Sequence, residues 1–300
     1  MKFTRLVYII SIATLFSCGG ENESKKAFED ASHHDEKIVS TPQISTEALV
    51  DIINSIPPPI ELSVLIKAVG GPYTSSPLNP TGNSSKYNTN FKRAVNLGIY
   101  GADLGYTSLY DQSQDAIDCL GAVKDLADEL SIGHFFDFET IKNLAASRHN
   151  LDSLVFISTQ NFAKMNDYLK ENNRVNLSVL MLTGGWLEGL HIAAHIASEH
   201  DSKELNERIG EQKIILNQIL ELLKVFQGQA EIKAFTVKMN ELKALYDKVE
   251  IITTYEESTL EEVDGILMVV DNTSSEVKIT AQLLKEITQK IEEIRNDLIN

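Results

Sequence analysis

The feature that most constrains the fold is a helical spacing of apolar residues, which is clearest in the C-terminal third of the chain. Stretches 202–227, 230–253 and 274–299 carry apolar side chains three and four residues apart, opposite a charged face. Amphipathic helices joined by short links pack as antiparallel neighbours in a bundle. Alternation with a period of two, which is typical of strands, is nearly absent after residue 46. The pattern therefore predicts helices.

The whole of 46–300 is expected to form an all-α, multi-helix antiparallel bundle of about nine to eleven helices. The segment between residues 70 and 88 is the main exception, because it contains three prolines, three glycines and many serines. A loop of this length is unusual in a compact domain, so we expect it to cover a site. The other expected helices are 46–55, 59–69, 90–110, 112–131, 138–149, 151–172, 175–200 and 256–271.

Composition excludes several classes of protein. The chain has 43 acidic and 27 basic residues, a net charge of −16, which argues against a nucleic-acid binder because phosphate recognition uses clustered Lys and Arg. Its hydrophobic fraction of 43% is too high for a disordered chain. Two cysteines exclude a disulfide-rich scaffold and a zinc site with four cysteine ligands.

The N-terminus has the organisation of a signal peptide. Lys2 and Arg5 form a short cationic region, and the stretch 6–16 that follows is uncharged. A helix that spans a bilayer needs about 20 apolar residues, and this stretch is much shorter. A secretory signal is therefore the better interpretation than a transmembrane anchor.

The end of that stretch, Leu15-Phe16-Ser17-Cys18, resembles the lipobox of bacterial lipoproteins. Leu15 and Ser17 match the usual leucine and small residue, whereas Phe16 is larger than the side chain usual at its position. The resemblance implies that a diacylglycerol is attached to the sulfur of Cys18, that the signal is cut just before this residue, and that the new amino group is acylated. A conventionally cleaved signal with a chance cysteine is the alternative.

These features predict three segments: a lipoprotein signal peptide over 1–17, a lipidated flexible tether over 18–45 and a helical domain over 46–300. The tether is polar, mixed in charge and almost without apolar periodicity. The expected location is the bacterial cell envelope, at the outer membrane, with the lipid on Cys18 as the contact with the membrane. Glu21 and Glu23 loosely resemble an export signal of surface lipoproteins, which leaves periplasmic and outward orientations both open.

The most unusual segment of the body is 175–200, which is apolar on most sides and is therefore expected to be the central helix. Glu188, His191 and His195 fall on one narrow stripe of it. The spacing of four between the histidines lets two imidazoles meet one ion, and Glu-x-x-His occurs in carboxylate-bridged metal bundles. A second such motif is missing from the sequence, as is the His-Glu-x-x-His pattern of zinc proteases. The predicted divalent-metal site is therefore incomplete.

A second helix could supply the missing partner. Asn96, Tyr100, Asp103, Thr107 and Tyr110 share one face of the expected helix 90–110. If that face meets the histidine stripe, Asp103 could orient a histidine or complete the metal site. The glycines at 98, 101 and 105 and Ala102 would let a neighbouring helix come close. The alternative is that both stripes are satisfied polar seams between helices or strips that face solvent.

The leading functional hypothesis is non-enzymatic: an envelope lipoprotein whose helical domain binds a partner protein. The main alternative is a metal- or small-ligand-binding bundle that uses Glu188, His191, His195 and Asp103. Hydrolysis comes third, because the sequence shows neither a catalytic triad nor a complete metal motif. Cys119 is expected to be buried and inert, and Trp186 to be a core side chain.

Overall fold

The computed structural model describes residues 45–58, 60–145, 151–200, 202–255, 259–263, 266–270 and 274–300. The expected signal peptide, Cys18 and the tether up to residue 44 lie outside these residues, as does the end of the expected helix 138–149. Ile44–Asn300 forms one compact unit with its own hydrophobic core.

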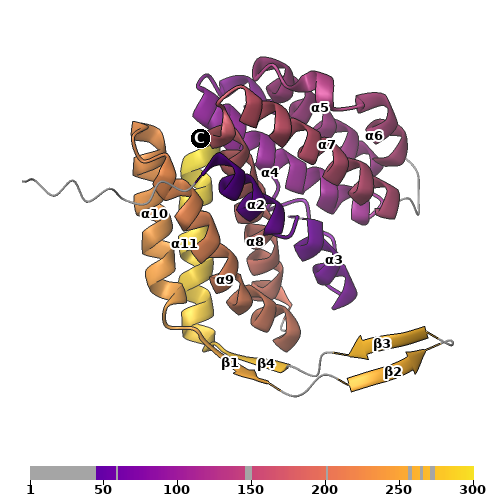
Figure 1. The fold of residues 1–300 in the computed structure, drawn as a ribbon, viewed down its shortest axis with the longest axis vertical. Coiled ribbons are helices and arrows are strands. Elements are labelled where there is room, and N and C mark those ends of the chain that lie inside the picture. Colours follow the sequence, from indigo (N-terminus) through magenta and orange to yellow (C-terminus); the bar gives the residue numbers. More distant parts are fainter. Residues whose placement is uncertain are drawn as a thin grey trace, which may run out of the picture. The chain divides into compact units, whose positions relative to one another are not determined.

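The described part contains ten α-helices, so the prediction of an all-α, multi-helix fold is confirmed (Figure 1). They are α2 (Thr46–Ser55), α3 (Ile60–Ala68), α4 (Asn90–Leu109), α5 (Ser113–Glu129), α6 (Phe138–Ala145), α7 (Leu151–Glu171), α8 (Val175–Glu199), α9 (Lys203–Val225), α10 (Ala230–Tyr246) and α11 (Ala281–Ile299). Two short 3₁₀ helices lie at Thr81–Lys86 and Gly133–Phe135.

Local sequence explains where several of these helices begin and end. The hydroxyls of Thr89 and Ser202 accept hydrogen bonds from backbone N–H groups in the first turns of α4 and α9, which are N-caps. Asp111, Ser131 and Asn173 follow α4, α5 and α7 with φ angles of 57°, 60° and 56°. This left-handed conformation ends a helix and turns the chain into the next one.

Helix α8 is the centre of the core, as its composition predicted. By length and hydropathy it resembles a membrane span, but its apolar window is entirely buried inside the protein. Its closest neighbour is α4: a Cβ atom at Gly98 would collide with the carbonyl oxygen of Met181, and one at Gly184 with that of Val95. Backbones can approach this closely only where both helices lack side chains.

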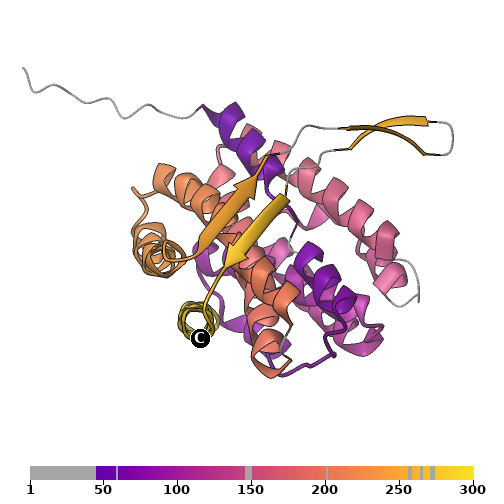
Figure 2. The ribbon, with the colours of Figure 1, turned by 90° about the horizontal axis from the view of Figure 1, so that it is seen from below.

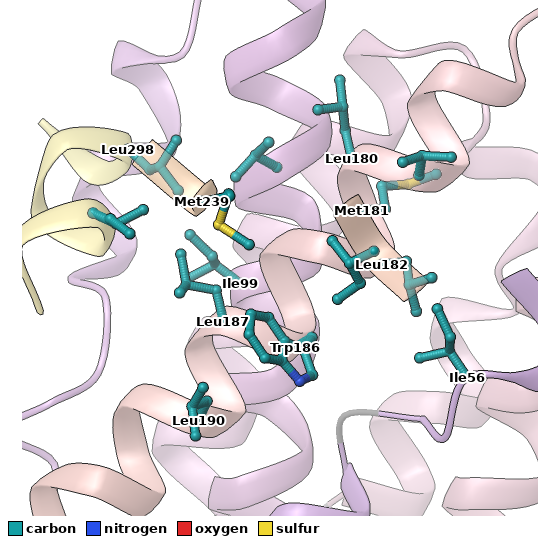
Figure 3. Close-up of a cluster of buried hydrophobic side chains, with 14 of the residues drawn as sticks. Ile56, Ile99, Leu180, Met181, Leu182, Trp186, Leu187, Leu190, Met239 and Leu298 are labelled. Carbon is teal, nitrogen blue, oxygen red and sulfur yellow. The ribbon is translucent and has the colours of Figure 1, made fainter. Parts of the chain in front are cut away.

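Helices α9, α10 and α11 pack around this centre and bury the predicted apolar stripes (Figure 1). Figure 3 shows Ile99 and Leu187 beside Met239 and Leu298 in one part of the core, and Met181 and Leu182 near Ile56 in another. The buried stripe positions are Leu205, Ile209, Leu216, Ile219, Leu223, Ile232, Phe235, Met239, Leu242, Tyr246, Val249, Ile287, Ile291, Ile294 and Leu298.

The segment 250–278 corrects the sequence analysis, which placed a helix over 256–271 and extended its neighbours to 253 and 274. It contains four strands instead: β1 (Glu250–Thr254), β2 (Thr259–Val263), β3 (Ile266–Val270) and β4 (Ser274–Lys278). The antiparallel pairs are β1 with β4, from Glu250↔Lys278 to Thr254↔Ser274, and β2 with β3, from Thr259↔Val270 to Val263↔Ile266. Figure 2 shows β1 and β4 side by side where the chain enters α11.

The physical reason is the density of β-branched residues. Ile251, Ile252, Thr253 and Thr254 are consecutive, and such side chains lose rotamer freedom in a helix but pack well in a strand. Asp264-Gly265 between β2 and β3 is also a pair that favours a two-residue hairpin turn. The β-branched run and the Asp-Gly pair were both present in the sequence. They favour strands more strongly than the helical spacing of apolar residues in this segment favours a helix.

Candidate functional site

The predicted metal residues are only partly brought together. Glu188 of α8 and Asp103 of α4 are both fully buried and lie close enough to interact. Both carboxylate oxygens of Glu188 accept hydrogen bonds from Arg295 of α11: Nε is 3.0 Å from Oε2, and Nη2 is 2.8 Å from Oε1. This bidentate pairing with Arg295 uses the same two Glu188 oxygens that would bind a metal ion.

The histidines of the stripe have separate environments. His191 is buried, and burial lowers its pKa although the charge of Glu188 opposes this, so the neutral imidazole is favoured. His195 is half-exposed; its Nε2 lies 3.1 Å from Ser76 Oγ and 3.6 Å from a carboxylate oxygen of Glu199. Within the described ranges, no group of three or more His, Cys, Asp and Glu side chains is placed to hold a metal ion. The geometry thus lends the metal hypothesis no support there.

The surroundings of Asp103 in this cluster favour its uncharged form. Burial, and then the negative charge of Glu188, raise its pKa well above the usual range, while Arg295 opposes the rise. Its Oδ2 accepts a hydrogen bond from the backbone N–H of Asn79 at 3.1 Å, but no donor faces its buried Oδ1. The raised pKa favours the neutral carboxyl of Asp103 beside the paired carboxylate of Glu188.

The long loop between α3 and α4, which was expected to cover a site, closes over this cluster. The carbonyl oxygen of Pro77 accepts a hydrogen bond from Arg295 at 2.7 Å, and Asn79 Nδ2 donates to the hydroxyl of Tyr87 at 3.0 Å. The side chains of Tyr100 and Tyr110 donate to loop carbonyl groups. Most of the polar face of α4 is thus paired with α11 and the loop, while Oδ1 of Asp103 has no donor.

Arg295 was not predicted as part of this cluster. A signal existed, because this arginine lies within the apolar stripe of the last helix, and a buried glutamate in an apolar helix requires a cationic or protonated partner. Pairing the two across 107 positions of the chain needs the tertiary structure.

The opposite side of α4 borders a cavity of about 370 Å³, which the sequence analysis did not predict. Segments from α2 to α8 line it, including Ile53 and Asn54 of α2 and Met165 of α7. Met181, Leu182 and Ile56 also line it and lie together at the right of Figure 3. Among its described lining residues, Asn54 has the only polar side chain and none is charged. Cavities of this size and lining accept small apolar ligands.

The glycines of α4 explain why the space exists. Gly98, Gly101 and Gly105 all line the cavity. Gly98 provides the close approach to α8 that the sequence predicted, but a Cβ atom at Gly101 would meet no other group within 4 Å. At Gly105 it would lie 3.2 Å from the end of the Ile60 side chain. The small-residue face therefore packs against a helix at one point and leaves an opening beside it.

Two further expectations can be checked against the structure. Cys119 is buried, and burial raises the pKa of its thiol, which makes it unreactive. Trp186 is a buried core side chain whose Nε1–H donates to Gln212 Oε1 at 2.9 Å. Comparison of the chain with protein-family models, curated protein sequences and solved structures gives no match.

Proposed function

We propose that the chain is a lipid-anchored protein of the bacterial cell envelope whose helical domain binds a small apolar ligand. The cavity beside Gly101 carries the second half of this proposal, since it combines a volume typical of ligand sites with an uncharged lining. The anchor is supported by the lipobox-like sequence ending at Cys18 and by the polar tether behind it.

The polar cluster around Glu188 contributes stability and position instead of binding. Its carboxylate is paired, its arginine is shared with the loop, and the loop covers it. The exposed large apolar side chains in the described part include Val64, Ile214, Val237 and Tyr255, which lie on different elements. Scattered apolar residues are normal on a protein surface, so they favour a partner-binding face less than the cavity favours a ligand.

The anchor is tested by intact-mass measurement of the protein purified from bacterial membranes. A mature chain that begins at Cys18 and carries the mass of attached acyl groups is the expected result. A mature chain that begins elsewhere, or a bare Cys18 thiol, contradicts the anchor. The substitution Cys18→Ala should move the protein out of the membrane fraction, because the acidic domain has no electrostatic attraction to anionic lipid.

Ligand binding is tested separately on residues 19–300, which retain the whole compact unit. Titration with Nile red, a neutral apolar dye, should show one saturable site. The variant Gly101→Leu should lose this site, because the new side chain projects into the cavity. Gly121→Leu is the matched control: Gly121 is an exposed glycine of α5 with open space around it and does not line the cavity. Wild-type protein that does not bind the dye contradicts this part of the proposal.

A further inference from the structure

The four described strands of segment 250–278 differ in charge. β1, β2 and β4 each contain at least one charged residue, whereas β3, with the sequence Ile-Leu-Met-Val-Val, contains none. Because successive residues of a strand point to opposite faces, an unbroken apolar run gives β3 two apolar faces. Such runs are typical of strands in the interior of a sheet. β3 therefore has the sequence of a central strand.

The position of β3 does not agree with this sequence. Among the described strands it pairs with β2 alone, so its second edge has no strand beside it (Figures 1 and 2). β2 and β3 also pack mainly against each other among the described elements. A hairpin of two strands is only marginally stable in water, and an apolar edge strand readily pairs with another chain. The second edge of β3 is therefore suited to a further strand.

The other edge of the hairpin is protected by charge. β2 contains Glu261 and Glu262 in succession. Charged residues on an edge strand oppose pairing, and pairing of β2 with β2 of another copy would bring like charges opposite one another. One edge of the hairpin is thus suited to pairing and the other is not. A partner strand added beside β3 closes the assembly instead of extending it into a fibre.

A second copy of the chain supplies a strand that fits this edge. Two β3 strands related by a twofold axis at Met268 run antiparallel over their whole length. Ile266 then lies opposite Val270 of the second copy, and Leu267 lies opposite Val269 of the second copy. Every cross-strand pair is apolar and none opposes like charges. β3 becomes a central strand of a four-stranded sheet whose two outer strands are β2, which agrees with the sequences of both strands.

We propose that the chain forms a homodimer by antiparallel pairing of the free edges of β3 in two copies. The contact is small, because five residues of each chain pair, so the dimer is weak and depends on concentration in solution. Attachment of both copies to one membrane would raise their local concentration. The pairing itself requires neither the lipid anchor nor the cavity, so its failure would leave the proposed function intact.

Cysteine cross-linking tests the pairing on residues 19–300, whose one native cysteine, Cys119, is buried. In Met268→Cys the two thiols would lie opposite each other, with Cα atoms about 4.5–5.5 Å apart, within reach of a disulfide. Glu261→Cys is the matched control, because Glu261 is the partner of Met268 within the same hairpin. In the dimer the two 261 positions are three strand spacings apart, about 14 Å, and cannot be bridged.

Oxidation with copper phenanthroline should give about tenfold more covalent dimer from Met268→Cys than from Glu261→Cys on a non-reducing gel. A mixture of Leu267→Cys and Val269→Cys should also cross-link, whereas each of these variants alone should give little dimer, because its thiols lie at diagonal positions. This mixture decides the result if Met268→Cys does not fold. Equal yields from Met268→Cys and Glu261→Cys, or no dimer from either, overturn the proposal.

Sedimentation velocity provides a second measurement. Wild-type residues 19–300 should move from monomer to dimer with rising concentration. Met268→Lys should weaken the dimer about tenfold, because two like charges meet at the twofold axis, while within its own hairpin the new charge lies opposite Glu261. Glu261→Lys is the control and should dimerise as wild type does. Wild-type protein that stays monomeric up to its solubility limit overturns the proposal, as do open-ended aggregates.

An extended peptide of another protein is the competing occupant of this edge. The full chain with Met268→Cys, oxidised in cell-envelope membranes, should form a covalent dimer with itself. Cross-linking to a different protein in place of a second copy overturns the proposal.

Discussion

Two faces of α4 differ in almost every respect. One face carries Asp103 and other polar side chains, all enclosed by α8, α11 and the loop before α4. The other face carries Gly98, Gly101 and Gly105 and borders an apolar cavity. The polar face resembles a functional site in the sequence and is a closed structural seam. The glycine face resembles a packing surface and leaves the space that a ligand can occupy.

The difference teaches that chemistry-bearing side chains are weak evidence of a site when their partners are unknown. Glu188 looks available until Arg295 satisfies both of its oxygens. Glycines are usually taken as evidence for close helix contact, and Gly98 agrees with that interpretation. Gly101, one turn further along the same face, does not. Substitutions on one face can therefore be compared with substitutions on the other.

Removal of the guanidinium on the polar face should have the largest effect. Arg295→Ala leaves the buried carboxylate of Glu188 without its partner, next to Asp103. The free energy of unfolding, measured with urea, should fall by about 3–5 kcal/mol. Lys238→Ala, which breaks an exposed ion pair with Asp297, serves as the control and should change little. Replacement of both Glu188 and Arg295 by Met should cost less than Arg295→Ala alone; a greater loss would contradict the pairing.

Substitution of Gly98, where the glycine face contacts α8, should cause the next largest loss of stability. In Gly98→Ala the added methyl group collides with the backbone of α8 at Met181, so the two helices must separate. A loss of about 1–3 kcal/mol in the free energy of unfolding is expected. Gly121→Ala, on the open surface of α5, is the matched control and should not lose stability. Equal stability of Gly98→Ala and wild type would show that the α4–α8 contact is looser than described.

Asp103→Asn tests the protonation of the polar face. The folded-state pKa of Asp103 lies above the ordinary value of 3.8, so its contribution to stability is fully present below that pH and is lost as pH rises toward the folded-state pKa. Asparagine keeps an acceptor for the N–H of Asn79 and carries no charge at any pH. The variant should therefore gain stability over wild type with rising pH, by about 1.4 kcal/mol for each unit by which the pKa is raised.

Urea unfolding of both proteins at a series of pH values measures this gain. Asp125→Asn, at an exposed position of α5, is the control and should show no comparable trend. An Asp103→Asn protein that loses stability relative to wild type as pH rises would indicate that Asp103 is ionised in the folded state.

The smallest change in stability is expected on substitution of Gly101, the glycine that faces open space. In Gly101→Ala the new methyl group meets no other group within 4 Å, and alanine stabilises a helix interior relative to glycine. Thermal or urea unfolding should show a gain of about 0.5–1 kcal/mol. The sign is opposite to that for Gly98→Ala, three residues away on the same face. A loss at Gly101 would mean that the cavity beside it is filled in the folded protein.

Much of the fold could be predicted because helix formation depends on local spacing. The stripe from Leu205 to Leu223 and that from Ile232 to Tyr246 are buried as expected, and Ser202 caps the helix it precedes. The exception is 250–278, where residues such as Ile251 and Val269 fit helical spacing and strands equally well. The pairing of β1 with β4 joins residues at least twenty positions apart, which local spacing does not report, whereas β2 and β3 pair locally.

For the candidate site, the sequence could identify candidate residues but not the groups with which they pair. The sequence offered the meeting of Asp103 and Glu188 only as a condition for a site, and the structure places the two side chains together. Arg295 was missed, although it forms an ion pair with Glu188 that uses both carboxylate oxygens. The cavity could not be predicted from the sequence. Its volume depends on how six or more segments pack around the space beside Gly101.

The sequence by itself determined the helices, the most buried helix, the acidic surface and the lipobox-like segment, because these depend on residues close together in the chain. The tertiary structure decided which polar groups are paired, where the chain turns into strands and where an apolar space remains. Those properties depend on groups that meet across the fold, such as Glu188 with Arg295 and Gly98 with Met181. A buried polar group that lacks a partner destabilises the fold. Only the complete packing shows which buried polar groups have hydrogen-bond partners.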